Sequence, residues 1–145
     1  MTARLHNPPL GLYVHMPWCV RKCPYCDFNS HALKAELPAQ RYVEALIADL
    51  EADLPLIWGR SVQSIYFGGG TPSLFPAEFI DRFLSQARAR LDLSPAVEVT
   101  LEANPGAIEH DSFAAYAQAG VNRVSLGVQS FDDDALKRLG RIHGR

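Results

Sequence analysis

The sequence has little sulfur and no long apolar run. Its 145 residues include three cysteines and two methionines, and no stretch comes near the ~18 consecutive apolar residues of a membrane-spanning helix. The first residues, MTARLHNPPLGLYVHM, also lack the continuous apolar segment of a secretory signal peptide. We therefore expect a cytoplasmic protein without obligatory membrane insertion.

An excess of positive charge is missing as well. Fourteen Lys and Arg stand against sixteen Asp and Glu, which gives a formal net charge of -2, and the basic residues are scattered along the chain. Nucleic acids and anionic membranes bind clustered positive charge, so we expect no nucleic-acid partner. Hydrophobic residues make up 48% of the chain and charged residues 21%, as in one globular domain with its own core.

All three cysteines lie within eight residues, in the run CVRKCPYC at positions 19–26. An odd number of cysteines in a chain without a secretion signal argues against a disulfide framework, because cytosolic thiols stay reduced. The cysteines are then available as ligands or nucleophiles. Their CxxxCxxC spacing in a loop lets three thiolates converge on one centre, and soft sulfur ligands favour zinc, copper(I) or an iron-sulfur cluster.

Two kinds of metal centre stay open from the residues alone. A tetrahedral structural zinc site needs a fourth ligand, which His15 or His31 would have to supply. A [4Fe-4S] cluster usually takes four cysteines, so three would leave one iron with an open coordination position. An open iron is a place for chemistry, whereas a closed zinc site only stabilises a fold.

Four β-rich stretches alternate with four helical patterns. The expected strands are LGLYVHM at 10–16, SIYFGGG at 64–70, VEVTLEA at 97–103 and RVSLGVQSF at 123–131. Helices are expected at about 38–54, 76–91, 109–119 and 132–140, with Gly120 capping the third and Asp132 beginning the fourth. This alternation predicts an α/β fold with parallel strands joined by right-handed crossovers. A doubly wound open sheet and part of a (βα) barrel both fit.

Glycines and polar residues follow the ends of these strands. GGGTPS at 68–73 ends the second strand, where glycines let a ligand approach the backbone, and no Lys follows them as in a nucleotide P-loop. Glu102 lies near the end of the third strand, where a carboxylate is costly unless it is paired or faces a ligand. Gln129 is expected at the corresponding place on the fourth strand, and Arg141 follows the fourth helix. Because parallel strand ends share one rim, we expect these residues and the cysteines to form one site.

Each of these candidates also has a plain structural interpretation. The glycines could form a flexible turn, Glu102 an edge salt bridge, Gln129 a capping contact and Arg141 a solvated charge. Tyr13 could equally be a core aromatic residue, and His15 suits a structural role better than that of a ligand. Three further aromatic residues are expected only to pack: Trp18, Trp58 and Phe131.

The run YVHMPWCVRKCPYCDF resembles the signature of radical S-adenosylmethionine (radical SAM) proteins, in which a CxxxCxxC loop holds a [4Fe-4S] cluster. The resemblance implies that Cys19, Cys23 and Cys26 ligate the cluster and that SAM completes the coordination of the fourth iron. The cofactor then carries the radical chemistry, and the protein supplies geometry and excludes water. The implied fold is a partial (βα)6 TIM-like barrel, of which this chain carries about four βα units.

Further motifs stand in register with the same family, namely GGGTPS, LEANP, RVSLGVQSFDD and GRIH. By this resemblance, residues that contact SAM are expected at Tyr13, Tyr25, Gly69, Gly70, Thr71, Glu102, Gln129 and Arg141. No catalytic residue is assigned. The family's proteins are longer, so residues 1–145 are expected to be the N-terminal part of a single radical SAM core domain.

Within the superfamily the chain is similar to the oxygen-independent coproporphyrinogen III oxidase group. The oxidase pattern continues as CxxxCxxCxC, whereas this chain has Phe28 at the last position and so resembles the haem chaperone subfamily. That subfamily implies haem binding and delivery of haem to an acceptor protein, and the cluster implies an electron donor. The haem ligands, which include a downstream HNxxY motif, are expected outside these 145 residues.

Two alternatives remain beside the chaperone. The first is the oxidase itself, which uses SAM for oxidative decarboxylation to protoporphyrinogen IX. Phe28 argues against coproporphyrinogen III dehydrogenase activity, although the radical SAM machinery is present. The second is a zinc-stabilised structural domain, which ranks last because it makes no use of the GGGTPS loop, Glu102 or Gln129.

Overall fold

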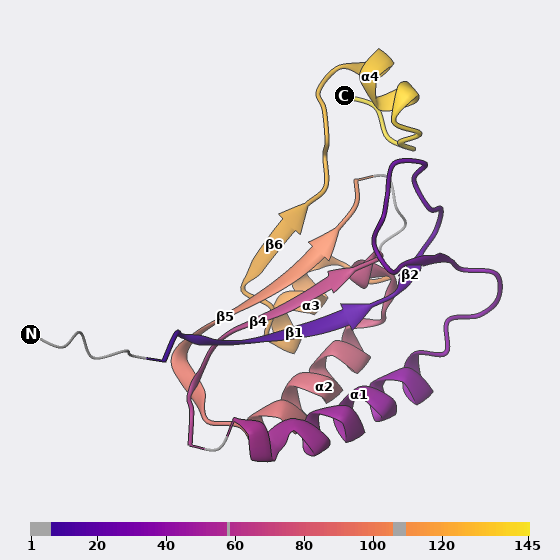
Figure 1. Cartoon of the computed structure of the whole chain (residues 1–145). Helices are drawn as coiled ribbons and strands as arrows, with labels where there is room; N and C mark the ends of the chain where they lie inside the picture. Colours follow the sequence, from indigo (N-terminus) through magenta and orange to yellow (C-terminus); the bar gives the residue numbers. More distant parts are fainter. Residues whose placement is uncertain (1–6, 58, 106–109) are drawn as a thin grey trace, which may run out of the picture.

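The computed structural model describes residues 7–57, 59–105 and 110–145 (Figure 1). Four parallel strands form one sheet, and a separate two-stranded sheet lies beside their carboxyl ends. The main sheet contains β1 (Leu10–Met16), β4 (Val62–Gly69), β5 (Leu93–Ala103) and β6 (Arg123–Leu126), and the small one pairs β2 (Trp18–Cys19) with β3 (His31–Ala32). The helices are α1 (Ala39–Asp53), α2 (Ala77–Arg90), α3 (Phe113–Ala119) and α4 (Asp133–Arg138), with short 3-10 turns η1 (Leu54–Leu56) and η2 (Pro72–Leu74).

The order of the strands decides between the two architectures that the sequence left open. A doubly wound sheet reverses its order at a switch point, whereas a barrel adds its strands in chain order. Here the order is β1-β4-β5-β6, with β1 at one edge and every pair parallel. The helices α1, α2 and α3 lie on one face of this sheet (Figure 1). The fold is therefore α/β of the partial TIM-like barrel type.

The core lies between the sheet and these helices. Strand residues that alternate toward the helices are fully buried, among them Ile65, Phe67 and Leu101. One face of α2 is buried too, with Ile80, Phe83 and Leu84 among its buried residues, and Phe83 meets Phe67 edge to face with ring centroids 5.7 Å apart. Burying such side chains contributes ~1.5–3 kcal/mol each. This packing fixes the tilt of the strands and so the position of their carboxyl ends.

The opposite face of the sheet is polar and aromatic. Tyr13 of β1 lies beside Tyr66 of β4, Tyr66 beside Thr100 of β5, and Thr100 beside Arg123 of β6. The two tyrosine rings are stacked with centroids 6.3 Å apart. In a barrel this face is the interior, so the polar row crosses the inner face of the sheet.

The expected fourth strand is too long. Strand β6 ends at Leu126, and Gln129 lies in the loop that follows, with a φ of 70° that no strand residue adopts. Backbone bonds from Val128 to Leu126 and from Ser130 to Val128 close tight turns there, in place of strand pairing. The assignment of Gln129 to a strand was therefore wrong.

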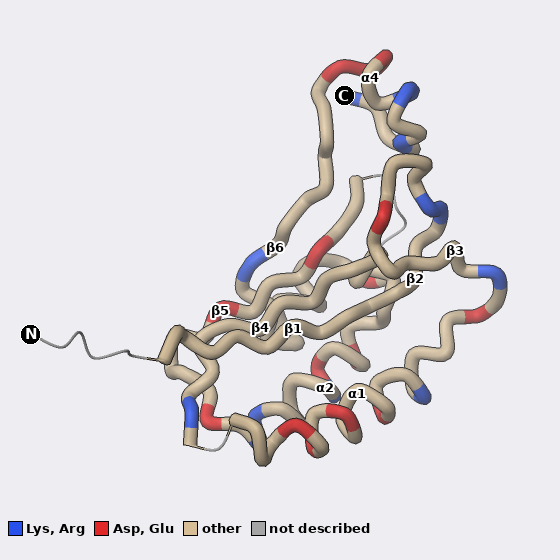
Figure 2. Tube along the Cα trace, in the orientation of Figure 1, with Lys and Arg blue, Asp and Glu red and all other residues tan. Residues whose placement is uncertain are grey.

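The other elements match the expectation more closely. Strand β1 has the expected bounds, Gly120 caps α3 with a φ of 108°, and Asp132 caps α4 through its carboxylate. Acidic residues begin α4 and basic residues end it (Figure 2), as the helix dipole favours. Helix α3 begins at Phe113 after the N-cap Ser112, and residues 110–112 are not helical, so the start expected near residue 109 was about four residues too early. Trp58 lies outside the described residues.

Two packing expectations had different outcomes. Trp18 packs edge to face on Tyr42, with ring centroids 4.7 Å apart, as expected. Phe131 is 76% exposed, so the expectation that it packs was wrong.

Within the described ranges, no helix combines the length and the hydropathy that crossing a bilayer requires.

Candidate functional site

A cleft of about 400 Å³ opens at the carboxyl ends of the four strands. Residues from the loops after β1, β4 and β6, from the end of β5 and from the segment after α4 line it. The three cysteines and seven of the eight expected SAM residues are among them: Tyr25, Gly69, Gly70, Thr71, Glu102, Gln129 and Arg141. The fold therefore brings these ten residues, which are spread over more than a hundred sequence positions, together around one cleft.

Tyr13 is the candidate that does not line this cleft. It lies lower on the polar face of β1, where its hydroxyl donates to Nδ1 of His15 over 2.9 Å. Burial, and then the nearby charge of Glu102, raise the pKa of Tyr13 above its usual value. His15 in turn lies directly against Gly69, so Tyr13 supports the glycine loop from behind.

The cysteine loop is held in shape by main-chain and side-chain bonds. The β2–β3 pair closes its base, with amide-to-carbonyl distances of 2.7 and 2.8 Å. Lys22 donates from Nζ to the carbonyl oxygens of Phe28 and Ser30, over 3.1 and 3.0 Å. His15 donates from Nε2 to the carbonyl oxygen of Asn29 over 2.7 Å. Because a carbonyl only accepts, Nε2 carries the proton and Nδ1 accepts from Tyr13.

These contacts bear on the kind of metal centre that the thiols suit. All three cysteines are free, Cys19 buried and the other two partly so. In the described part of the chain, no three His, Cys, Asp or Glu side chains are arranged to hold one metal ion. Both ring nitrogens of His15 are engaged, and His31 is exposed on β3. A zinc site, which draws four ligands to about 2.0–2.3 Å from one ion, gains no support here, whereas three soft donors around one cleft suit a larger iron-sulfur cluster.

Glycine is required where the loops after β1 and β4 meet. A Cβ atom on Gly70 would lie 2.5 Å from the carbonyl oxygen of Trp18 and 2.9 Å from that of Met16. The amides of Gly70 and Thr71 bond these same two oxygens, each over 2.7 Å. The glycine run is thus a tight backbone junction behind the cysteine loop, rather than a flexible turn.

Glu102 is held by neutral donors. Its Oε1 accepts from the hydroxyl of Tyr66 over 2.6 Å, and its Oε2 accepts from the amide of Gly69 over 3.1 Å. Burial, and then this bond to Glu102, raise the pKa of Tyr66. The edge salt bridge considered for Glu102 is therefore not its contact, and a carboxylate is oriented at the cleft.

Asn104 joins the loops across the cleft, and the sequence did not single it out. Its Nδ2 donates to Oγ1 of Thr71 over 3.0 Å, and its Oδ1 accepts from Arg141 over 2.9 Å. Arg141 also donates to the carbonyl oxygen of Gly127 over 2.6 Å and lies 3.5 Å from the sulfur of Cys23. Arg141 is thus a cross-link between loops and not a solvated charge. The available signal was the place of Asn104 directly after the strand, two residues beyond Glu102.

Tyr25 lies within the same group of contacts. Burial mainly raises its pKa, a hydrogen bond to Cys23 adds to this, and the charge of Arg141 opposes it. The Tyr25 phenol therefore stays protonated at neutral pH and can donate a hydrogen bond at the cleft.

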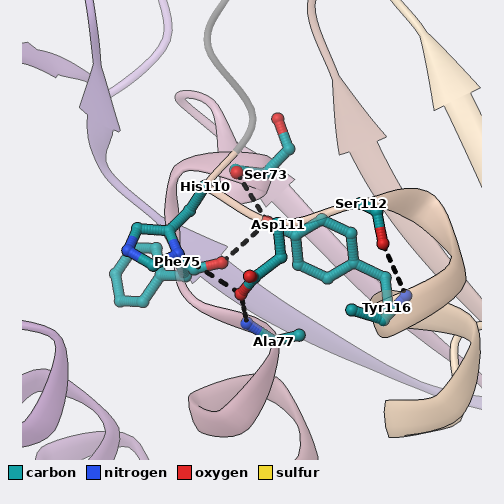
Figure 3. A network of polar contacts seen from close by, with 8 residues as sticks. Ser73, Phe75, Ala77, His110, Asp111, Ser112 and Tyr116 are labelled. Atoms are coloured by element: carbon teal, nitrogen blue, oxygen red, sulfur yellow. Dashed lines mark hydrogen bonds and ion pairs between the residues drawn. The ribbon is translucent and has the colours of Figure 1, made fainter.

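A second polar network braces the segment that follows Thr71 (Figure 3). The hydroxyl of Tyr116 in α3 lies 2.7 Å from the carbonyl oxygen of Ser73 and 2.9 Å from that of Phe75. Asp111 accepts from the amide of Ala77 over 2.7 Å at the start of α2. The start of α3 therefore fixes the path of the chain between the glycine loop and α2.

Comparison with known proteins agrees with this geometry. The family model described as the radical SAM superfamily matches residues 13–145. The chain is 58% identical to heme chaperone HemW of Escherichia coli K12 over 94% of its own length and 36% of that protein. It is 54% identical to heme chaperone HemW of Haemophilus influenzae, with 94% and 37% covered.

A solved structure is similar as well. It is that of coproporphyrinogen III oxidase (HemN) from Escherichia coli, a radical SAM enzyme, and it superposes with a TM-score of 0.82 at 32% identity, over 97% of this chain and 32% of that one. The chain thus spans about a third of the length of the relatives it matches. Because the family model covers nearly all of the chain, and the family's cysteine and glycine motifs line one cleft, the chain belongs to the radical SAM superfamily.

Proposed function

We propose that this chain is the N-terminal part of a single radical SAM core domain, in a longer cytoplasmic protein that acts as a haem chaperone. Residues 1–145 would hold a [4Fe-4S] cluster and SAM, and the whole protein would bind haem and deliver it to an acceptor protein. A bound cluster of this kind supplies one electron for the reductive cleavage of SAM, and a separate donor must deliver that electron. The identities of 58% and 54% to proteins described as haem chaperones support this function.

The residues of the cleft divide into two roles in this proposal. The three cysteines ligate the cluster, and the seven lining residues expected from the sequence contact SAM. The phenol of Tyr25, the side-chain amide of Gln129 and the oriented carboxylate of Glu102 offer donors and acceptors to a zwitterionic ligand. Tyr13 supports His15 behind Gly69, because it lies below the cleft.

The preference for the chaperone over the oxidase depends on Phe28. Phe28 stands where the oxidase pattern has a further cysteine, and it lines the cleft with 59% of its surface exposed. A phenyl ring there cannot act as a thiol, so chemistry that depends on that cysteine is lost, while the three cluster thiolates remain. The alternative, the oxidase, is supported by the 32% identity and the shared fold with HemN.

The test uses the full-length protein reconstituted under anaerobic conditions. We expect stoichiometric haem uptake in an absorption titration, and no decarboxylation of coproporphyrinogen III when SAM and a reductant are supplied. Turnover to the decarboxylated product would overturn the chaperone in favour of the oxidase. Absence of haem uptake in the reconstituted protein would overturn the chaperone as well.

The cluster assignment is tested separately by Cys23→Ala. Loss of one of three thiolates should abolish assembly, so iron and acid-labile sulfide should fall from about four of each per chain to background. Phe28→Cys is the matched control, because it adds a thiol without removing a ligand and should leave the iron content unchanged. A full iron content in Cys23→Ala would refute the assignment.

A further inference from the structure

The mouth of the cleft is apolar, in contrast to its floor. Five large side chains with apolar surface line the cleft and expose between 47 and 59% of their surfaces: Val20, Tyr25, Phe28, Leu126 and Ile142. We call these five residues the apolar rim. Deeper positions such as Cys19, Thr71 and Ala103 are at most 8% exposed. Exposed apolar patches of this kind mark binding sites.

The rim is assembled by the fold rather than by one stretch of sequence. Val20, Tyr25 and Phe28 belong to the cysteine loop, Leu126 ends β6, and Ile142 follows α4. In Figure 1 the cysteine loop and α4 lie next to each other beyond the ends of the strands. The rim therefore borders the cleft from two sides.

Positive charge accompanies the rim. Among the described residues that line the cleft, the charged ones are Arg21, Arg141 and Glu102, a formal sum of two positive charges and one negative. Glu102 already accepts from Tyr66 and Gly69, and Arg141 is bonded to Asn104 and Gly127. Arg21 is exposed at the cysteine loop. The rim thus offers apolar surface beside an exposed guanidinium group.

These features favour a particular class of ligand. SAM is a charged nucleotide, and it suits the polar part of the cleft, where the Glu102 carboxylate offers an acceptor and the Gln129 side chain offers both a donor and an acceptor. The rim remains for a second ligand with a broad apolar surface and carboxylates at one edge. A tetrapyrrole with propionate side chains has this chemistry.

Building on the proposed function, we propose that the apolar rim, apart from Tyr25, which contacts SAM, binds one face of the haem macrocycle, with Phe28 against the ring and Arg21 paired with a propionate. An aromatic side chain packed on a flat conjugated ring contributes both apolar burial and stacking. Arg is suited to the carboxylate because its guanidinium binds carboxylates in a bidentate way. Phe28 then contacts haem, in addition to replacing the further cysteine of the oxidase pattern.

The test measures haem affinity in the full-length protein after cluster reconstitution. Phe28→Ser should weaken haem binding about tenfold, which corresponds to ~1.4 kcal/mol, and leave the iron content and the SAM affinity unchanged. Phe28→Leu keeps apolar volume without the ring and should lose less, about threefold. The matched control is Phe113→Ser, because Phe113 is a 42% exposed residue of α3 that does not line the cleft.

Arg21 is tested by comparing haem with its dimethyl ester, in which both propionates are neutral. The wild-type protein should prefer haem over the ester, Arg21→Gln should remove that preference, and Arg21→Lys should retain part of it. A preference unchanged in Arg21→Gln would overturn the propionate contact.

Failure of this inference differs from failure of the proposed function. If the wild-type protein binds haem and Phe28→Ser binds it equally well, the rim is not the haem surface and the chaperone stands. The same holds if Phe28→Ser and Phe28→Leu lower only the unfolding midpoint, because the rest of the protein then covers the rim. An equal loss of SAM affinity would assign the rim to SAM. If the wild-type protein does not bind haem, the proposed function itself fails.

Discussion

A single carboxylate ties the start of α2 to the segment before α3. Asp111 Oδ2 accepts from the amide of Ala77 over 2.7 Å and lies 3.2 Å from Nδ1 of His110. The bond from the Ala77 amide, and then the bond with His110, lower the pKa of Asp111. A carboxyl group whose pKa is lower in the folded than in the unfolded chain stabilises the fold only while it is ionised.

We therefore expect Asp111→Asn to change how stability depends on pH. The contribution of Asp111 is fully present above its unfolded pKa of about 3.9, and it is lost as the pH falls through the lower folded value. The wild-type chain should exceed the variant in free energy of unfolding at pH 7, and the difference should shrink below about pH 4. Urea unfolding at several pH values measures this. A difference that stays constant from pH 7 to pH 3 would contradict the assignment.

At the residue scale, the sequence singled out ten of the residues that line the cleft, but neither Asn104 nor the bonds by which Arg141 joins the loops. The cysteines and the glycines were identified because each set forms a short sequence motif with a recognisable spacing. Asn104 and Arg141 act through bonds between separate loops, at 2.9 Å from each other, and this depends on where β5 and α4 end in space. Gln129 was misplaced for a related reason, since its positive φ follows from turns after β6 that no apolar pattern marks.

At the element scale, α1 and α2 were predicted best, and their bounds agree with the expectation within a residue. Both helices bury one face, and such burial imposes a period of 3.6 residues that the sequence shows. The small β2–β3 pair carries no such period, because two-residue strands are too short to show one. Tertiary contacts at the base of the cysteine loop create this pair.

The link between α3 and the glycine loop gives a prediction at this scale. Tyr116 is fully buried, and its hydroxyl serves the carbonyl oxygens of Ser73 and Phe75. Tyr116→Phe keeps the ring but removes that donor, which should lower the free energy of unfolding by about 1–3 kcal/mol. Tyr13→Phe is the control, because its hydroxyl is exposed and its loss should cost less than ~0.5 kcal/mol. Equal costs in the two variants would show that the Tyr116 hydroxyl does not brace the loop.

At the scale of the whole molecule, the sequence predicted alternating strands and helices but not their order in space. Periodicity describes one element at a time, so it fits a doubly wound sheet and a barrel equally well. The order is set by which neighbours each strand pairs with, and here each new strand joins the same growing edge. This arrangement leaves β1 and β6 with one neighbouring strand each.

The edge strand β6 should be less stable than the central strand β4. Strand β6 has four residues and pairs only with β5, and its Val124 and Leu126 are exposed, whereas β4 lies between β1 and β5 and is largely buried. An unpaired edge offers free amides and carbonyls to water or to another chain.

In the 145-residue chain we expect amides of β6 to exchange with solvent faster than those of β4, and their protection to rise with protein concentration as edges associate. Hydrogen exchange measured by mass spectrometry at two protein concentrations tests both effects. The full-length protein is the control, and its β6 amides should be protected at either concentration. Equal protection of all four strands in the 145-residue chain, independent of concentration, would contradict an open edge at β6.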